Sequence, residues 1–301
     1  MTLVRSGFTQ SDDGIALHWR AVGSGPVILC ANGVGVGTFF WKYLVDAFRD
    51  TNTVVVWDYR GHGLSSRDID ARSTALSVRR HAQDLWAVAD AACAGEPVLL
   101  VGHSMGCQVV LEAGSLAPGR TAGLVLMLGS AGKTLSTFFD NPRSPQFFRA
   151  VDGLVRALGP RAGEAVRPLL GSPVAWWGAI GLRLVDPYYT RREDLQPYLD
   201  HLASMDFRVF TRCVRSLQEH DAWPKLGEIA APVLVVAAEN DQFTPVWCSR
   251  RIAASIPGAE LLVLADASHA ALIEQPETIH HRLRRFIAAR LPAWGPPPPP
   301  P

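Results

Sequence analysis

Cysteine is scarce in this sequence and is not arranged in pairs. The chain has 301 residues and five cysteines, an odd number, with no C-x-x-C spacing. Scattered cysteines argue against a disulfide framework and against a zinc site, and they are typical of a reducing compartment. Several lie in apolar runs, where cysteine usually behaves as a small hydrophobic residue. The five are Cys30, Cys93, Cys107, Cys213 and Cys248.

An excess of charge of either sign is also lacking. The sequence has 29 Lys and Arg against 28 Asp and Glu, a formal net charge of +1. This balance offers no electrostatic case for binding nucleic acid or an anionic membrane surface. Short arginine pairs such as Arg79-Arg80 and Arg284-Arg285 are interpreted as solvated helix faces.

Long hydrophobic runs are missing as well. Near the N-terminus, Arg5 and then a polar stretch interrupt the sequence before the apolar region of a signal peptide could form. The apolar stretch 173–182 has about half of the ~20 residues that a membrane-spanning helix needs. We therefore predict a cytoplasmic protein without integral membrane association.

What the sequence does contain is an alternation of short β-branched runs with longer amphipathic segments. Strands are expected at 15–22, 26–32, 52–59, 97–103, 122–128, 232–238 and 260–266, and helices at 38–49, 75–92, 107–117, 246–256 and 276–291. Such alternation predicts an α/β fold, a mostly parallel sheet flanked by helices. The first strands, separated by "SDDG" and "GSG", are expected to form an antiparallel hairpin at the sheet edge.

The alternation stops in the middle of the chain. Residues 133–223 contain no convincing strand and many prolines and aromatics, which predicts a helical cap inserted before the strand at 232–238. The core is then expected in two parts, 1–132 and 224–294. The final segment 295–301, "GPPPPPP", is expected to be an extended, disordered tail.

The segment "VGHSMGCQVV" places Ser104 in a G-x-S-x-G pattern, between a buried strand and the start of a helix. A serine on such a strand-to-helix turn, with glycines that allow close approach, has the context of a nucleophile elbow. The helix N-terminus also favours negative charge developing nearby. Ser104 is therefore the candidate nucleophile, against the alternative of a polar turn residue.

A serine hydroxyl needs a base to take its proton. His269 is the candidate, because it follows the last predicted strand, at the carboxyl-end edge of the sheet where Ser104 also lies. His103 adjoins Ser104 but should point to the opposite face of its strand. The other histidines fit less well: His18 and His62 lie on an early hairpin and in a loop, and three are expected on helix surfaces, namely His81, His280 and His281.

An orienting carboxylate is expected after the preceding strand. The segment "PVLVVAAENDQFTP" offers Glu239 and Asp241, either of which could accept the imidazole N–H and stabilise the imidazolium. Asp241 lies further into the loop and is preferred.

The order Ser104, Asp241, His269 resembles the α/β-hydrolase superfamily. "GHSMG" matches the elbow, and "DYRGHGLSS" resembles the D-x-R-G-x-G-x-S loop of many members. "SHAALIEQPE" resembles the histidine loop H-x4-E-x-P-E, with Ser268 where glycine is usual, and Ala238 replaces a common glycine in the acid strand. The match covers most of the chain outside the cap and implies the α/β-hydrolase fold.

The same resemblance implies an oxyanion hole made by the backbone N–H groups of Met105 and Val34. Relatives commonly have His-Gly in the loop before Val34, whereas this chain has Asn32-Gly33, which is similar to 3-oxoadipate enol-lactonases. Asn32 is a candidate substrate contact or a brace for the loop. Trp41, Trp176 and Trp177 are candidate pocket walls, with ordinary packing as the alternative for each.

These features predict a serine hydrolase that cleaves a small-to-medium, largely apolar carboxylic ester or lactone through an acyl-enzyme. No cofactor and no metal are expected. A carbon–carbon hydrolase would use the same triad, and a buried pocket arginine, with Arg183 and Arg208 as candidates, would favour it. Two further candidate functions are a cofactor-free perhydrolase, which would keep the triad, and a non-catalytic ligand-binding receptor on a hydrolase fold.

Overall fold

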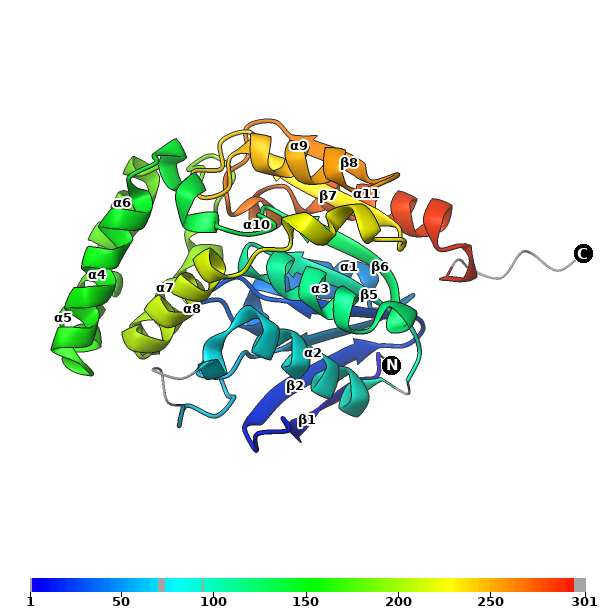
Figure 1. The fold of residues 1–301 in the computed structure, drawn as a ribbon, viewed down its shortest axis with the longest axis horizontal. Helices are drawn as coiled ribbons and strands as arrows, with labels where there is room; N and C mark the ends of the chain where they lie inside the picture. The colour runs from blue at the N-terminus through cyan, green and yellow to red at the C-terminus, as the bar shows by residue number, and fades with distance from the viewer. Residues whose placement is uncertain (1, 70–73, 94, 295–301) are drawn as a thin grey trace, which may run out of the picture.

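The computed structural model describes residues 2–69, 74–93 and 95–294, and an eight-stranded sheet runs through its centre (Figure 1). The strands are β1 (Val4–Gln10), β2 (Ala16–Gly23), β3 (Val27–Ala31), β4 (Thr53–Trp57), β5 (Val98–His103), β6 (Thr121–Met127), β7 (Val233–Ala238) and β8 (Glu260–Leu264). Their spatial order is β1-β2-β4-β3-β5-β6-β7-β8. The predicted tail at 295–301 lies outside the described residues.

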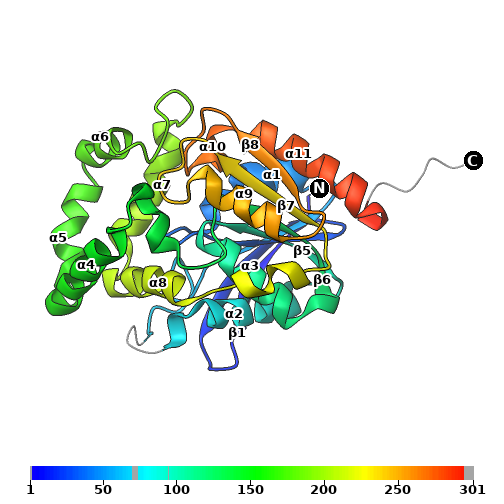
Figure 2. The same cartoon turned by 45° about the horizontal axis from the view of Figure 1, so that its top comes forward.

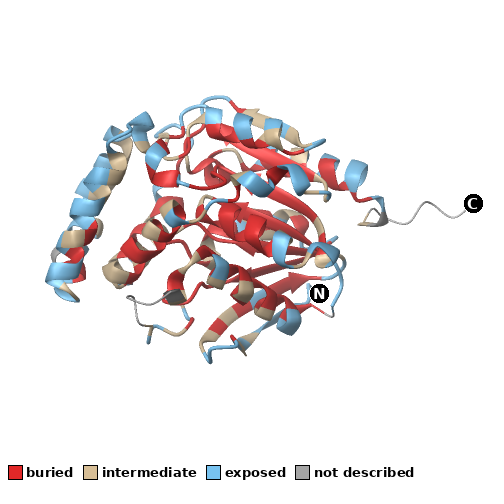
Figure 3. Ribbon diagram, in the orientation of Figure 1, coloured by how far each residue is buried: buried red, intermediate tan, exposed pale blue. Residues whose placement is uncertain are grey.

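The sheet is parallel from β4 to β8 and antiparallel at its first edge. β1 pairs with β2, and β2 with β4, in antiparallel register, so the predicted edge hairpin is confirmed. Every residue of β3, β4, β5 and β7 is buried, as Figure 3 shows for the sheet interior. Strands covered on both faces need continuous apolar runs, which is the pattern that the sequence has there.

Helices cover both faces of the sheet. α2 (Val78–Ala92), α3 (Met105–Leu116) and α9 (Val246–Ser255) pack on one face, and α1 (Lys42–Phe48) and α11 (Pro276–Arg290) pack on the other, each set with its own apolar cluster. Short helical segments complete the core: η1 (Thr38–Trp41), η2 (Thr74–Leu76), η3 (Pro118–Arg120), η5 (Trp223–Glu228), α10 (Ala271–Glu274) and η6 (Pro292–Trp294). The predicted α/β-hydrolase architecture is thereby confirmed.

A helical insertion separates β6 from β7 and extends to one end of the molecule (Figures 1 and 2). It contains η4 (Thr134–Asp140), α4 (Ser144–Leu158), α5 (Arg161–Leu170), α6 (Pro173–Gly181), α7 (Arg192–Ser204) and α8 (Phe207–Glu219). Its two ends meet, because Gly132 and Asp221 form an antiparallel bridge and the Ala222 N–H donates to the Ala131 carbonyl at 2.7 Å. The insertion therefore leaves and rejoins the core at one place.

Glu274 ties the insertion to the loop after β8. Its buried carboxylate accepts the Asp186 N–H at 2.8 Å and the Thr190 hydroxyl at 2.9 Å from the insertion. From the loop it accepts the Ser268 N–H at 2.7 Å and is 2.6 Å from the Ser268 hydroxyl, which also contacts the Leu184 carbonyl at 3.1 Å. The serine that replaces the family's usual glycine thus joins the two segments.

We expect Glu274→Ala to lower the free energy of unfolding by about 3 kcal/mol, because removing a buried acceptor leaves several donors unsatisfied. Urea denaturation measures the change. Glu277→Ala, at an exposed site in the next helix, is the matched control and should change stability by less than about 0.5 kcal/mol. Equal effects of the two substitutions would show that Glu274 does not anchor the insertion.

Candidate active site

Ser104 occupies a sharp turn between the end of β5 and the start of α3. Its backbone has φ 54° and ψ −115°, in the left-handed half of the map that non-glycine residues rarely enter. Such a conformation costs about 1–3 kcal/mol and persists only where the surrounding structure enforces it. Here the Ser104 N–H is held by the Met127 carbonyl of β6 at 2.9 Å.

Two glycines make this turn sterically possible. A Cβ on Gly102 would lie 2.3 Å from the Gly106 carbonyl oxygen, and a Cβ on Gly106 would lie 2.0 Å from the Ala31 carbonyl oxygen. Neither distance is tolerable for a real Cβ, so helix α3 could not approach β3 and β5 this closely with other residues. The glycines of the G-x-S-x-G pattern are thus explained by close packing.

Three side chains form a continuous hydrogen-bonded row. His269 Nε2 is 2.9 Å from Ser104 Oγ, and His269 Nδ1 is 2.8 Å from Asp241 Oδ2 and 2.9 Å from Oδ1. Ser104 follows β5, Asp241 follows β7, and His269 follows β8. Parallel strands bring their carboxyl ends to one edge, and this topology gathers three residues that are far apart in the chain.

Asp241 is the carboxylate that reaches the histidine. Its buried side chain also accepts the Phe243 N–H at 2.8 Å, the Thr244 N–H at 2.9 Å and the Thr244 hydroxyl at 2.8 Å, which fixes its orientation. Glu239 is exposed to solvent. Of the two carboxylates that the sequence left open, the geometry favours Asp241.

The loop at 32–34 lies directly against the serine. A Cβ on Gly33 would be 3.3 Å from Ser104 Cβ, so the loop backbone contacts the elbow. Within the part of the chain that the structure describes, neither the Val34 N–H nor the Met105 N–H donates a hydrogen bond. Met105 begins α3, where the first N–H groups have no intrahelical acceptor. Both donors remain available to an external oxygen.

His62 braces this loop from below. Its Nε2 accepts the Gly35 N–H at 3.2 Å, while its Nδ1 is 3.0 Å from the Arg60 carbonyl. Burial lowers the pKa of His62 to about 3, so the ring is neutral and keeps one acceptor and one donor nitrogen. Tyr59 adds a hydrogen bond from its hydroxyl to the Asn32 carbonyl at 2.9 Å. Sequence reasoning considered His62 only as a base and missed this positioning role.

The side chains of Asn32 and Trp41, which the sequence offered as candidate substrate contacts, are turned into the protein interior. Both are 0% exposed. Asn32 Nδ2 donates to the Trp57 carbonyl at 2.7 Å, and Trp41 Nε1 donates to Asn32 Oδ1 at 2.6 Å. Their side-chain polar atoms are hydrogen-bonded within the protein, which favours the brace that the sequence offered as the alternative for Asn32.

Trp176 and Trp177, from α6, do not join the row around Ser104. Trp177 is 67% exposed, and Trp176 is partly buried against the apolar cluster that includes residues of the insertion and of α11. Packing on this cluster accounts for Trp176, whereas Trp177 faces solvent. Their role as pocket walls stays a prediction.

Two histidines that were expected on helix surfaces are buried. His81 is 0% exposed and packs against Tyr59, and His280 is 8% exposed and packs against Phe48. Burial lowers the pKa of His81 to about 3 and that of His280 to about 4. The expectation was wrong because both residues lie on the apolar stripes of their helices; His281 is exposed as expected.

His103 does not join the hydrogen-bonded row, but its ring lies against the loop that carries His269. Its Nε2 is 3.1 Å from the His269 carbonyl, and the two ring centroids are 5.1 Å apart. Burial lowers the pKa of His103 to about 3, so a neutral ring supports the backbone of the histidine loop.

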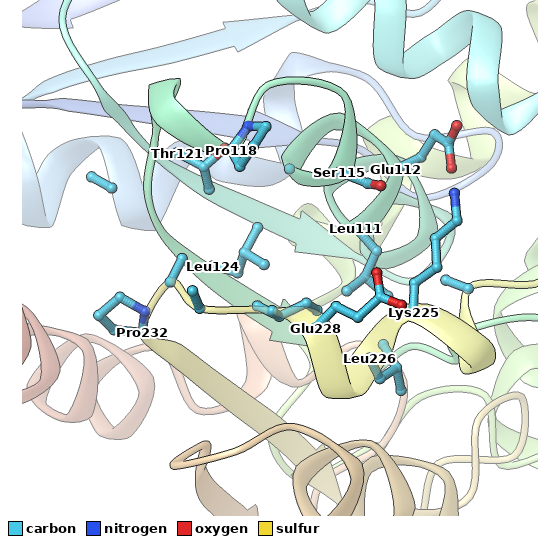
Figure 4. A pocket seen from close by; sticks show the side chains of 16 residues that line it. Leu111, Glu112, Ser115, Pro118, Thr121, Leu124, Lys225, Leu226, Glu228 and Pro232 are labelled. Carbon is cyan, nitrogen blue, oxygen red and sulfur yellow. The ribbon is translucent and has the colours of Figure 1, made fainter.

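A separate cavity of about 430 Å³ lies at the far end of α3. Figure 4 shows its lining from α3, β6 and η5, which includes Leu111, Glu112, Leu124 and Lys225. Ser104, Asp241 and His269 are not among the residues that line it. In the described residues, no three His, Cys, Asp or Glu side chains gather as a metal site, and no helix is both long and apolar enough to cross a bilayer.

Comparison with known proteins identifies the family of this chain. The model of the Alpha/beta hydrolase family matches residues 28–282, and the chain belongs to that family. The fold and the family together define a hydrolase.

Individual relatives and solved structures are similar to most of this chain. A protein of Variovorax paradoxus (strain S110) named "Putative carbamate hydrolase RutD" is 29% identical over 275 residues, which covers 90% of this chain and 96% of the relative. The structure of Est816, described as an N-acyl homoserine lactone degrading enzyme, is 26% identical with a TM-score of 0.71 and covers 93% of this chain and 100% of its own. The enol-lactonase from Burkholderia xenovorans LB400 shares the fold with a TM-score of 0.76 at 20% identity, covering 94% and 100%.

The buried histidines predict a stability that falls in acid. Their folded pKa values lie below the unfolded value of about 6.5, so the unfolded chain binds more protons as the pH drops below about 6.5. Each such histidine then lowers the free energy of unfolding by on the order of 1 kcal/mol per pH unit, until the pH reaches its folded pKa. We expect His81→Leu to reduce this slope, measured by urea unfolding between about pH 7 and pH 5. His281→Leu, at an exposed position, is the control; an equal slope in wild type and His81→Leu would contradict the prediction.

Proposed function

We propose that this protein is a serine hydrolase that cleaves carboxylic esters or lactones through an acyl-enzyme. The observation that supports this most directly is the row Ser104–His269–Asp241, with spacings of 2.9 and 2.8 Å at its two junctions. Nucleophile, base and orienting carboxylate are each within hydrogen-bond reach, which is the arrangement that activates a serine.

In the proposed first step, Ser104 Oγ attacks the substrate carbonyl while His269 Nε2 takes its proton. Asp241 holds the ring through Nδ1 and stabilises the imidazolium. The oxyanion accepts hydrogen bonds from the backbone N–H groups of Val34 and Met105. Loss of one such donor commonly lowers the rate by about 10²–10³.

In the second step, His269 gives its proton to the leaving oxygen and the carbon–oxygen bond breaks. Water then attacks the acyl-enzyme with His269 again as base, which releases the acid and restores Ser104. These residues account for the whole cycle.

We further propose that the helical insertion is a cap over the site and that it selects an apolar substrate. A Cβ on Gly35 would be 2.6 Å from Leu202 Cδ2 and 3.0 Å from Phe210 Cε2, so α7 and α8 pack directly on the loop that carries Val34. An apolar cover excludes water from the oxyanion site and strengthens the hydrogen bonds made there. The lactone-degrading activity in the description of Est816 agrees with this substrate class.

A second candidate is hydrolysis of a carbamate, which is favoured by the name of the relative that is 29% identical over 90% of this chain. The same row would attack the carbamate carbonyl, and the carbamoyl-serine would be hydrolysed by water. The leaving alcohol or amine would receive its proton from His269.

The carbon–carbon hydrolase alternative loses its two candidate arginines. Arg183 is exposed, and Arg208 is paired with Asp206 at 2.5 Å and is partly exposed. A perhydrolase would use the same three residues, and turnover with peroxide and a carboxylic acid would distinguish it from an ester hydrolase. A binding-only receptor would not need the strained backbone of Ser104.

A fluorophosphonate probe is expected to label Ser104, and Ser104→Ala should abolish labelling. The same substitution should lower kcat/KM for p-nitrophenyl esters by a factor on the order of 10⁵. Ser115→Ala, exposed on the same helix, is the control. Labelling at another residue, or full activity of Ser104→Ala, would disprove the mechanism; parallel assays with lactones and aryl carbamates decide between the two candidates.

Asp241→Asn should lower kcat by about 10⁴, because an amide favours the wrong histidine tautomer. The matched substitution Glu239→Gln, two residues away and exposed, should leave kcat near that of wild type. Steady-state kinetics on one ester measures both. The reverse pattern would assign the orienting role to Glu239.

A further inference from the structure

A cluster of aromatic rings extends from His269 to the protein surface. The Phe243 ring meets the His269 ring at a centroid distance of 4.9 Å and an interplanar angle of 68°. Phe138 and Phe139 meet Phe243 in turn, at 5.0 and 5.8 Å. Phe139 is the most exposed of the three rings, at 45%. We call Phe138, Phe139 and Phe243 the aromatic wall.

Hydrogen bonds connect the aromatic wall to the loop that carries Asp241. The Phe243 N–H donates to Asp241 Oδ1 at 2.8 Å, so this ring is tied to the carboxylate that orients His269. The Phe243 carbonyl accepts the Thr137 hydroxyl at 2.6 Å, and the Phe139 N–H donates to the Gln242 carbonyl at 2.5 Å. Hydrogen bonds therefore join the beginning of the insertion to the loop that carries Asp241.

Phe139 keeps an unfavourable backbone for an exposed residue. Its φ is 55° and its ψ 23°, and the next residue, Asp140, has φ 47°. Glycine would adopt this conformation without strain. Burial does not explain an aromatic side chain at such a position, because nearly half of it faces solvent. Strain of this kind at a site is a reason to look for a function of the side chain.

The departure of the leaving group during acylation indicates which part of a substrate the wall meets. His269 Nε2 must give its proton to the leaving oxygen, so that oxygen and its first carbons lie beside the imidazole. The acyl oxygen is held at the loop of Val34, under Leu202 and Phe210 of the insertion. Phe243 adjoins His269 directly, and Phe138 and Phe139 adjoin Phe243, so the wall extends from the side chain that protonates the leaving oxygen.

We propose that the aromatic wall binds the leaving group and that the preferred substrates carry an aromatic ring on the alcohol side, as in a benzyl ester. This inference rests on the proposed hydrolase function. In acylation the Ser104 oxygen–carbonyl carbon bond forms, the carbonyl carbon–alkoxy oxygen bond breaks, and the serine proton leaves on the aryl alcohol through His269. Edge-to-face ring contacts, as within the wall itself, favour a flat aromatic partner.

Two isomeric esters test the inference. Benzyl acetate carries its ring on the leaving group, and methyl phenylacetate carries the same ring on the acyl side. We expect Phe139→Gly to lower the ratio of kcat/KM for benzyl acetate to that for methyl phenylacetate by about three- to tenfold. Because each ester is compared with itself in two proteins, intrinsic leaving-group reactivity cancels. An unchanged or increased ratio would overturn the proposal.

A control separates selectivity from folding. Phe147→Ala removes an exposed phenylalanine of the same insertion, 75% exposed on α4, and should not change the ratio. The urea midpoint of Phe139→Gly should be no lower than that of wild type, because glycine relieves the left-handed strain. A lower midpoint together with equal losses on both esters would show a merely structural residue and would also overturn the proposal.

A binding measurement distinguishes failure of the wall from failure of the proposed function. Benzyl alcohol, the leaving group itself, is titrated calorimetrically into wild type and Phe139→Gly, and its Kd should rise about three- to tenfold in the variant. If wild type hydrolyses neither ester but this difference is found, the ester-hydrolase function fails and the wall stands. Equal binding to both proteins would refute the wall whatever the turnover.

Discussion

The close approach of helix α3 to strands β3 and β5 is the constraint on which the rest of the site depends. At Gly106 the helix lies so near the Ala31 carbonyl that no side chain fits between them. The chain must then turn sharply from β5 into α3, and Ser104, at the turn, takes a backbone conformation that is unfavourable for serine. The same turn presents its hydroxyl at the sheet edge, beside the free N–H groups at the start of α3.

Around this turn, buried polar groups position loops that have no regular structure of their own. The neutral ring of His62 and the hydroxyl of Tyr59 hold the loop at 32–35, and Glu274 holds the loop that carries His269. Each of these groups is buried with its hydrogen bonds satisfied, so each restrains a loop strongly. Glu274 also bonds to the insertion, so the position of the insertion is linked to that of the histidine loop.

The errors of sequence reasoning have identifiable physical causes. His81 shares a helix face with Val78, Ala82 and Leu85, and this spacing would have placed it in the core if the pattern had been weighed above its polarity. The family resemblance places Asn32 in the loop of the oxyanion hole, which makes its side chain a candidate substrate contact. Its partners, Trp41 and the Trp57 carbonyl, become neighbours only in the folded sheet. The role of His62 was missed for the same reason.

The sequence by itself determined the alternation of strands and helices, the elbow pattern around Ser104 and the order in which the serine, carboxylate and histidine follow their strands. These features depend on side-chain periodicity and local turn chemistry, which a sequence displays directly. Only the tertiary structure decided that Asp241 rather than Glu239 reaches His269, that the Asn32 side chain bonds to Trp41, and that Phe138 and Phe139 lie beside Phe243. Those outcomes depend on contacts between segments distant in the chain, which form only when the strands align in the sheet and the insertion packs against its edge.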